Sequence, residues 1–473
     1  MDKKNKYTHR FLARIVIKAE TPIAVSSGGK DVISDKLILR DVNGLPYLPG
    51  TTIAGIVRHA LDEKKAQSFF GYSAEDDPND LGRGSEIIFS SAYIVDKDKR
   101  VVEGLISEVE KSDYLHLFDE LPVRQHVAIN DKGVNKSKGK FDEEVVYKGT
   151  HFCFEIEMLS DGKNCADFDA VLDEIASDVF RIGSGTRKGF GKISIVECKR
   201  ATLNLENISD RKAYLKKSAS LNDNDFWDNQ KNVKPAKVEQ DWLTYRLLLE
   251  PDDFYLFGSG FGDDDADMTP VSEICIDWNY GDDREPVFQH QYILIPGTSI
   301  KGALSHRIAF HYNKMKGFTI REVNGEYVRN ENAKVGVDNY AVNTLFGYTI
   351  ENENNSKRGN VIFSDLMQYQ YEENRDQIKL LNHVAIDRFT GGAIDGALFS
   401  EKTVYGCGQT YELEILVNKN VLFVEDEEEQ EERDVIKKAF ERSLNDIVTG
   451  MLPLGGGVNR GNGCFSGSWT INE

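Results

Sequence analysis

The sequence contains little cysteine, and its six cysteines are scattered over 473 residues without any C-x-x-C pair. This spacing argues against a zinc site and against a disulfide framework of the secreted type, so a reducing cytoplasm is the expected compartment. The sequence also lacks an apolar run long enough to cross a bilayer, and no apolar stretch of a signal peptide follows the polar residues 1–6. A membrane partner is therefore not expected.

Positive charge is also scarce, since 58 Lys and Arg residues stand against 78 Asp and Glu residues and give a formal net charge of −20. Taken alone, this balance argues against binding of free nucleic acid, because contacts to phosphates normally need a basic surface. Net charge governs solubility and long-range steering, however, whereas a binding groove is local. Much of the acid falls in two runs, 263–265 and 425–432, which are typical of exposed loops or tails.

Three motifs occur twice, in the same order. Residues 49–55 (PGTTIAG) return as 296–302 (PGTSIKG), residues 126–130 (HVAIN) as 383–387 (HVAID), and the glycine-rich residues 183–191 as 455–463. A period of this size indicates two domain-sized copies rather than a solenoid. We expect a first domain over residues 1–202, a polar linker over 203–241 and a second domain over 242–473, which suits the length of the chain.

Both copies show the same order of expected secondary structure. An alternating strand (10–19 and 244–250) precedes the Pro-Gly turn, and apolar residues at helical spacing follow it. In the first copy two strands (87–90 and 150–158), a helix (168–180) and a closing strand (192–196) come next. In the second copy the corresponding elements are two strands (361–364 and 410–417), a helix (433–448) and a closing strand (465–471). This β-α-β-β-α-β order is that of a ferredoxin-like (RRM-like) α+β domain, so we predict two such domains in tandem, with insertions.

The glycine-rich loops lie between a helix and a strand. Closely spaced glycines allow positive φ and close approach of another backbone, so a tight connection is the simpler explanation for any single glycine. Arg187, Lys188 and Arg460 favour a further role, because basic side chains in such loops have no reason to pack in a core and can follow phosphates. A dinucleotide-binding fingerprint and a P-loop both fail to match, since no strand precedes the loop and no G-K-[ST] ends it. No nucleotide cofactor is expected.

The helices that begin after the two Pro-Gly turns can present free N–H groups and a positive dipole end to an anion. His59 and His306 occupy equivalent positions on these helices, beside Arg58 and Arg307. A single helical histidine is more often an ordinary surface or core residue, whereas recurrence at the same register favours a function. The sequence leaves both interpretations open.

Longer motifs carry a resemblance to a known family. The first copy contains R-D-V-N-G-L-P-Y-L-P-G at 40–50, and the second contains I-D-R-F-T-G-G-A at 386–393 and L-G-G-G-V-N-R-G at 454–461. These segments resemble the RAMP superfamily, in particular the backbone subunits of type III CRISPR effector complexes (the Csm and Cmr kind). The resemblance covers nearly the whole chain apart from the linker. The double copy is similar to the fused subunits of type III-D-like systems.

The resemblance implies that each copy binds CRISPR RNA along its palm, with complementary target RNA and other type III effector subunits as partners. A β-hairpin thumb, around residues 126–140 and 383–398, is expected to enter the guide–target duplex. A loop Asp before the Pro-Gly segment is expected to cleave the target RNA opposite each thumb, which makes the chain an RNA-guided endoribonuclease. Two alternatives remain: a non-catalytic RNA-binding scaffold, and a CRISPR RNA processing endonuclease with a metal-independent site at His59 or His306.

The resemblance also implies which residues act. The catalytic Asp corresponds to Asp35 in the first copy, with Asp31 as the alternative, and to Asp267 in the second, with Asp263, Asp264 and Asp265 as alternatives. An Asp in such a loop is also a common turn former. Because RNA supplies the 2′-hydroxyl as nucleophile, the carboxylate can hold Mg²⁺ (or Mn²⁺) or act as a base, and the sequence does not choose between these roles. The residues expected to contact RNA are Arg58, His59, His126, Lys136, Lys138, Gly183, Ser184, Gly185, Arg187, Lys188, Lys301, His306, His383, Arg388, Phe389, Gly455, Gly456, Gly457, Asn459 and Arg460.

The first thumb departs from the family pattern. Asn130 and Asp131 stand where Asp387 and Arg388 stand in the second copy, and the R-x-T-G segment is missing. Four lysines occur there instead and can meet phosphates, although a solvated hairpin tip has the same composition: Lys132, Lys136, Lys138 and Lys140. We therefore expect two neighbouring, non-identical positions along one RNA.

Overall fold

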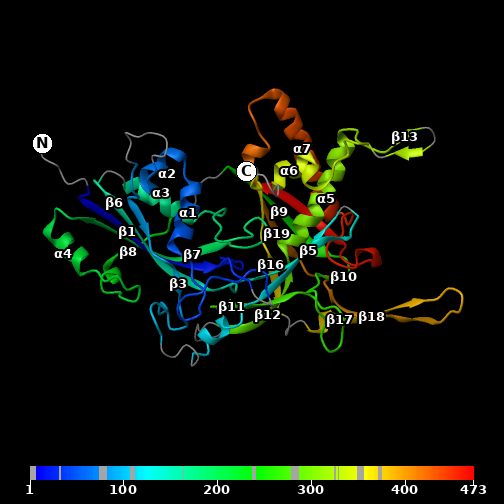
Figure 1. Cartoon of the computed structure of the whole chain (residues 1–473), viewed down its shortest axis with the longest axis horizontal. Helices are drawn as coiled ribbons and strands as arrows, with labels where there is room; N and C mark the ends of the chain where they lie inside the picture. The colour runs from blue at the N-terminus through cyan, green and yellow to red at the C-terminus, as the bar shows by residue number, and fades with distance from the viewer. Residues whose placement is uncertain are drawn as a thin grey trace.

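The computed structural model describes residues 7–30, 34–73, 82–106, 112–130, 132–162, 165–236, 241–278, 287–323, 326–328, 330–348, 356–370 and 375–472. The two copies lie side by side along the longest axis of the molecule, with the helices of both copies toward the same side (Figure 1). Each copy has its own hydrophobic core.

The first copy is built on an antiparallel sheet with the strand order β2-β6-β1-β7-β8, in which the short β3 also pairs with β6. Helices α1, α2 and α3 cover one face and bury Ile53, Val57 and Phe168 against it. The strands are β1 (His9–Ala19), β2 (Ile87–Phe89), β3 (Tyr93–Ile94), β6 (His151–Ser160), β7 (Ile193–Asn204) and β8 (Lys231–Asn232), and the helices are α1 (Gly50–Ala60), α2 (Glu63–Phe70) and α3 (Cys165–Ile175).

The second copy repeats this arrangement with the strand order β15-β19-β9-β20, again antiparallel throughout. Helix α5 packs against α7 over the sheet. The elements are β9 (Trp242–Pro251), β15 (Val361–Phe363), β19 (Tyr411–Asn418), β20 (Phe465–Asn472), α5 (Gly297–Met315), α6 (Tyr340–Phe346) and α7 (Glu427–Val448). The mixture of helices and antiparallel sheets in both copies agrees with the expected α+β class.

Part of the second acidic run is helical, although the sequence suggested an exposed loop or tail. Asp426 accepts a hydrogen bond from the backbone of Glu429 and caps α7, whose first turn contains Glu427, Glu428 and Glu429. Carboxylates at the start of a helix interact favourably with its dipole. This placement explains why a run of like charges is tolerated in regular structure.

A β-hairpin extends from each copy. In the first copy β4 (Val123–Ile129) pairs with β5 (Asn135–Glu144), and in the second β17 (Ile378–Ile386) pairs with β18 (Ala393–Tyr405), to which β10 (Phe254–Tyr255) adds. The tip of the β17–β18 hairpin projects away from the body of the molecule (Figure 1). The first hairpin instead contacts the second copy, since Lys140 lies 5.9 Å from the ring centre of Phe261.

The two copies are docked through residues from a small sheet that contains β11, β12 and β16. Ile276, on β11, is buried in the core of the first copy, and Trp278 stacks on His151 with ring centres 4.0 Å apart. Arg124 forms ion pairs with Glu273 and, at 2.9 Å, with Asp365 of the second copy. The strands of the small sheet are β11 (Ser272–Asp277), β12 (Val287–Ile295) and β16 (Leu366–Gln370), and a separate hairpin contains β13 (Arg321–Val323) and β14 (Glu326–Val328).

The polar segment between the copies packs against the first sheet. It contains helix α4 (Ile208–Lys216) and strand β8, and Trp227 is fully buried beside Leu12 and Leu203. Phe11 of β1 stacks on Phe168 of α3, whereas the next residue, Leu12, lies in the buried cluster of Trp227. Because neighbouring residues on a strand point to opposite faces, the polar segment covers the face of the sheet opposite α3. No helix within the described residues is long and apolar enough to cross a membrane.

Candidate functional site in each copy

Asp35 lies at the foot of the first hairpin and is exposed. Its backbone N–H donates to the carbonyl of Asp142 on β5 at 3.1 Å, and its Oδ2 accepts from the N–H of Asp142 at 3.1 Å. The next residue, Lys36, pairs with Glu143 in a parallel bridge. The loop therefore holds the Asp35 carboxylate beside the second strand of the hairpin. Asp31 lies outside the described residues.

Asp267 occupies the same position in the second copy. Its N–H donates to the carbonyl of Ser400 on β18 at 2.9 Å, and its Oδ2 accepts from the N–H of Ser400 at 2.8 Å. The next residue, Met268, pairs with Glu401 in a parallel bridge. The hydrogen-bond pattern thus makes Asp267 the structural counterpart of Asp35.

The neighbouring acidic side chains of the second loop are engaged differently. Lys402 Nζ lies 2.5 Å from the carboxylate of Asp263 and 3.1 Å from that of Asp265. The hydrogen bond from Lys402 holds the pKa of Asp263 below its usual range. Asp264 is exposed. None of these three carboxylates makes the pair of contacts that Asp35 and Asp267 share.

A buried carboxylate next to this position joins the hairpin to the glycine-rich loop. In the second copy Glu401, 0 % exposed, lies 3.0 Å from His383 Nε2 and 2.7 Å from Arg460 Nη2, and Asn462 donates to it at 3.4 Å. Phe399 stacks on His383 with ring centres 4.7 Å apart and lies under the guanidinium of Arg460. One carboxylate therefore ties both hairpin strands to the terminal glycine loop.

The first copy contains the same cluster. Glu143 is 2 % exposed and lies 2.8 Å from His126 Nε2, while Phe141 stacks on His126 at 4.8 Å. Lys36 lies 3.4 Å from Glu143, and Lys188 of the glycine loop lies over Phe141. Burial alone would raise the pKa of Glu143, but the hydrogen bond and charge of His126, with Lys36, hold it below its ordinary value. We call these two groups the His–Glu clusters.

The sequence analysis predicted the two histidines as RNA contacts and did not single out the two glutamates that they meet. The signal was present, because Phe141-Asp142-Glu143 on β5 corresponds to Phe399-Ser400-Glu401 on β18. This short F-x-E repeat follows the longer His-Val-Ala-Ile repeat, and only strand pairing shows that the glutamate reaches the histidine.

The donor set beside Asp35 fits a magnesium ion better than the one beside Asp267. Mg²⁺ usually takes one or two protein carboxylates and keeps several waters. Asp142 Oδ1 is buried and has no hydrogen-bond partner among the described residues, so a second carboxylate is available next to Asp35. In the second copy Ser400 replaces that carboxylate. The described part of the chain contains no cluster of three or more His, Cys, Asp or Glu side chains suited to a metal.

The first glycine loop lies against the second copy. Ser184 N–H donates to the carbonyl of Ala24 at 2.7 Å, and Gly183 and Gly185 have positive φ. A Cβ at Gly183 would lie 2.3 Å from the Ala24 carbonyl, so glycine is required there. The carbonyl of Gly189 accepts from the N–H of Asp365 at 3.3 Å. This placement brings the basic residues of the loop to the boundary between the copies.

Three cations meet at this boundary. Arg187 and Lys188 come from the glycine loop and Lys301 from the first turns of α5. Burial, together with the positive charges of Lys188 and Arg187, lowers the pKa of Lys301 to about 8. Burial also lowers the pKa of Lys188. A protein with a large negative net charge thus has a local basic seam between its copies.

The first amide of α5 is not free for a ligand anion, contrary to the expectation for a helix start. Gly297 N–H donates to Oδ1 of Asp365 at 2.8 Å, and Asp365 is also paired with Arg124. In α1 the N–H of Gly50 has a weaker partner, Ser91 Oγ at 3.4 Å. The second helix start is therefore neutralised from within the protein.

A model of the RAMP superfamily matches residues 16–194 and 280–466, well over half of the chain. The chain belongs to the RAMP superfamily. The two matched regions coincide with the two copies, so this is a double-copy RAMP protein. No curated protein gives a significant match to the chain. Membership of the superfamily indicates a CRISPR-associated RNA-binding subunit, with CRISPR RNA and other effector subunits as partners.

The two hairpin tips of this RAMP protein have related turns. Asn130 Oδ1 accepts from the N–H groups of Lys132 and Val134, and Asp387 Oδ1 accepts from those of Phe389 and Thr390. Asn130 and Asp387 thus share a turn-forming role. The described RNA-contact candidates at the tips are exposed: Lys136, Arg388 and Phe389, the last completely; the Lys138 side chain lies outside the described residues.

The remaining candidates lie on the two helices and the second glycine loop. Arg58 and His59 are exposed near the end of α1, and His306 is half-buried on α5. The terminal loop contains a 3₁₀ turn at Val458–Arg460 and includes the candidates Gly455, Gly456, Gly457 and Asn459. The structure therefore does not gather all the candidates into one place but distributes them over two similar sites.

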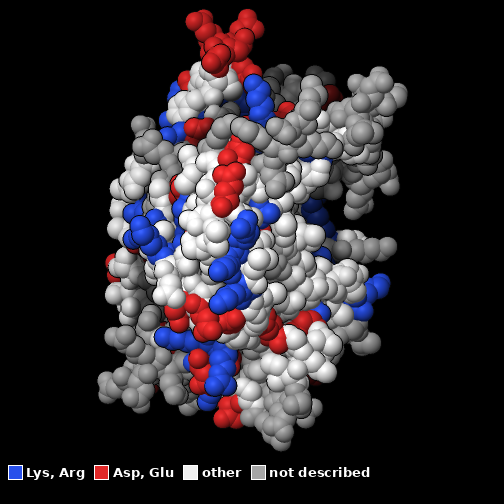
Figure 2. Space-filling model, turned by 90° about the vertical axis from the view of Figure 1, so that its left-hand side faces the viewer, with Lys and Arg blue, Asp and Glu red and all other residues white. Residues whose placement is uncertain are grey.

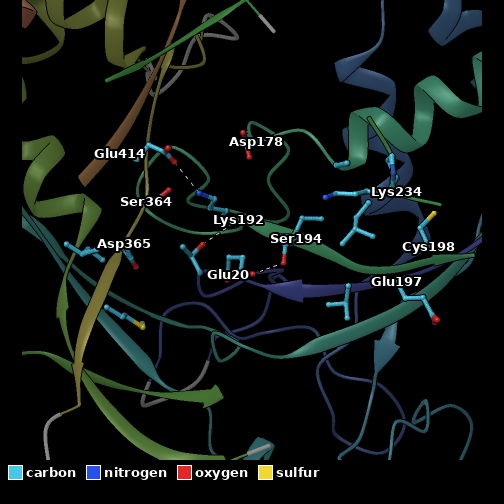
Figure 3. A pocket seen from close by; sticks show the side chains of 18 of the residues that line it. Glu20, Asp178, Lys192, Ser194, Glu197, Cys198, Lys234, Ser364, Asp365 and Glu414 are labelled. Carbon is cyan, nitrogen blue, oxygen red and sulfur yellow. Dashed lines mark hydrogen bonds and ion pairs between the residues drawn. The ribbon is translucent and has the colours of Figure 1, made fainter. Parts of the chain in front are cut away.

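Two other regions of the RAMP protein are poorly suited to phosphate. A cavity of about 1060 Å³ between the copies is lined by β7, β16 and β19, and Lys192 in it is paired with Glu414 at 3.3 Å (Figure 3). Its charged residues are mostly acidic: Glu20, Asp178, Glu197, Asp365, Glu412 and Glu414, with Lys192 and Lys234. On the end face of the first copy, basic and acidic side chains are intermingled in small groups (Figure 2). Neither region offers a basic groove.

Proposed function

We propose that the protein is a CRISPR RNA-binding backbone subunit of a type III effector complex that cleaves complementary target RNA at one or both copies. The observation that carries this proposal is the equivalent placement of Asp35 and Asp267 at the foot of two hairpins. We further infer that each copy is a ferredoxin-like domain, because both sheets have the same strand order. The double copy supports a fused subunit of the type III-D-like kind.

The basic seam supports the RNA-binding part of this proposal. Lys188, Arg187 and Lys301 lie where the glycine loop of one copy meets the helix start of the next. Positive side chains that are not neutralised by carboxylates of the protein attract an anionic ligand, and RNA carries one negative charge per phosphate. A guide strand that passes from the first copy to the second would cross this seam. Repetition of the glycine loop at 455–463 offers a further contact along the same strand.

The cleavage chemistry needs few protein groups. The 2′-hydroxyl of RNA is the nucleophile, and the hairpin and loop hold the nucleotide so that attack is in line. Asp35 or Asp267, exposed beside the hairpin, can accept the proton of that hydroxyl. A bound Mg²⁺ would instead supply stabilisation of charge on the phosphate, with Asp35 and Asp142 as its protein ligands. The His–Glu clusters fix the hairpin relative to the glycine loop.

Product mapping on the assembled complex tests the proposal. Asp35→Asn and Asp267→Asn are each expected to remove one cleavage product and leave target binding intact. Asp225→Asn, an exposed position in the segment between the copies and outside both hairpins, is the matched control and should leave both products unchanged. A target with 2′-deoxyribose at the scissile positions should bind and resist cleavage. Persistence of both products in the Asp35/Asp267 double variant would refute the catalytic assignment.

A second candidate function, cleavage at the first copy with binding alone at the second, is favoured by one observation. Ser400 stands where the first copy has Asp142, so the second site has one carboxylate fewer. In that case a single product, sensitive only to Asp35→Asn, should appear in the same assay.

A further inference from the structure

A second cavity, of about 470 Å³, lies between the two copies and contains three arginines. Arg181 comes from the segment before β7, Arg187 from the first glycine loop and Arg358 from the segment before β15. The cavity also includes His59 of α1 and Trp242 at the start of β9. Its volume falls within the usual range for ligand sites.

The charged groups that act on the pKa of Arg187 are both cations, Arg358 and Arg181. Its Nε donates to the carbonyl of Gly359 at 3.0 Å, and the group lies 5.2 Å from the ring centre of Trp242. Its Nη1 is buried and has no hydrogen-bond partner among the described residues. Burial, together with the charges of Arg358 and Arg181, lowers the pKa of Arg187 to about 9.

Arg181 is 3 % exposed. Its Nη1 donates to the carbonyls of Asp178 and Phe180, whereas its Nε and Nη2 are buried without a hydrogen-bond partner in the described part of the chain. Burial lowers the pKa of Arg181 to about 10, although the charges of Asp178 and Glu414 act in the opposite direction. The two carboxylates that line the cavity itself are Glu174 and Asp241, and the latter accepts from Asn420 at 3.5 Å.

Leaving a buried N–H group without a hydrogen-bond partner is costly, and more so when the group is charged. Guanidinium groups present a fork of donors that matches phosphate oxygens, and pairs of this kind are strong. We propose that this cavity, between Arg181, Arg187 and Arg358, binds a phosphate group. The phosphate belongs either to the backbone of the RNA that crosses the basic seam, which rests on the proposed function, or to a free nucleotide.

The proposal is tested on the full-length chain alone. Inorganic phosphate and adenosine 5′-monophosphate are titrated at constant ionic strength in chloride, and binding is measured by calorimetry and by the rise in melting temperature. Arg358→Gln changes an exposed side chain and should preserve the fold, and Arg187→Gln removes the central cation. Arg211→Gln on α4, also exposed, makes the same change of net charge away from the cavity and is the matched control.

Each cavity variant should weaken binding about tenfold or more, because a hydrogen bond to a charged group contributes about 1.5–3 kcal/mol and 1.4 kcal/mol is tenfold in affinity. The control should bind like the parent protein. Absence of phosphate binding by the parent protein, or equal binding by Arg358→Gln and Arg211→Gln, would overturn the proposal.

A competition experiment identifies the source of the phosphate. A short single-stranded RNA that displaces inorganic phosphate, and loses affinity in Arg358→Gln, assigns the cavity to RNA. Simultaneous binding of RNA and adenosine 5′-monophosphate assigns it to a free nucleotide. Failure of this proposal is distinguishable from failure of the proposed function, because the cleavage products of the assembled complex depend on Asp35 and Asp267 and are measured separately.

Discussion

Replacement of Glu401 by glutamine removes the central charge of the second His–Glu cluster and nearly preserves the shape of the side chain. Glu401 is completely buried and accepts from His383, Arg460 and Asn462. Glutamine can still accept hydrogen bonds, but it leaves His383 and Arg460 without their counter-charge. The hairpin strand and the glycine loop then lose the ion pair that joins them.

The expected cost follows from the contacts. A hydrogen bond to a charged group contributes about 1.5–3 kcal/mol, and breaking a buried ion pair costs about 3–5 kcal/mol. The Arg460 side chain is 36 % exposed, so solvent screens part of its interaction. We therefore expect the free energy of unfolding to fall by about 2 kcal/mol, which lowers the melting temperature of a domain of this size by about 4–8 °C.

Thermal unfolding followed by circular dichroism measures this change. Asp395→Asn lies on the same strand, is exposed and should change the free energy of unfolding by no more than about 0.5 kcal/mol. In the cleavage assay Glu401→Gln should reduce the product of the second copy and spare that of the first, which serves as an internal reference. Equal stability of Glu401→Gln and Asp395→Asn, together with unchanged products, would refute the role assigned to the cluster.

Three further predictions follow from single contacts. RNA binding at constant ionic strength should weaken between pH 7 and 9, because Lys301, with a pKa of about 8, loses its charge as the pH rises. Lys301→Arg keeps its charge over this range and should remove the pH dependence, so a fall in RNA affinity that persists in the variant contradicts the assignment. Asp142→Ser should raise the Mg²⁺ concentration needed for the first-copy product, measured against the second-copy product, and an unchanged midpoint would show that the carboxylate holds no metal. Gly149→Ala should destabilise the protein by about 1–3 kcal/mol more than Gly133→Ala, as measured by thermal unfolding. Both glycines have positive φ, but only at Gly149 would a Cβ clash with the carbonyl of Ile276 in the other copy. Equal losses of stability in the two variants would mean that this contact between the copies is not tight.

Much of the fold could be predicted because the relevant signals are local. The alternation of apolar residues indicated β1 and β9, and helical spacing after the Pro-Gly turns indicated α1 and α5. The acidic run at the start of α7 was less obvious, since like charges are typical of loops and only the cap at Asp426 shows why they are tolerated.

The sequence alone determined that the chain is a doubled RAMP protein, and it predicted Asp35 and Asp267 as candidate catalytic residues, because repeated motifs of fixed order can be compared without knowing how they fold. The tertiary structure decided which side chains meet. Glu143 reaches His126 and Glu401 reaches His383 only through strand pairing, and Arg181, Arg187 and Arg358 come together only because the copies dock. Such contacts join residues far apart in the chain, and their charges and burial depend on packing that no local pattern records.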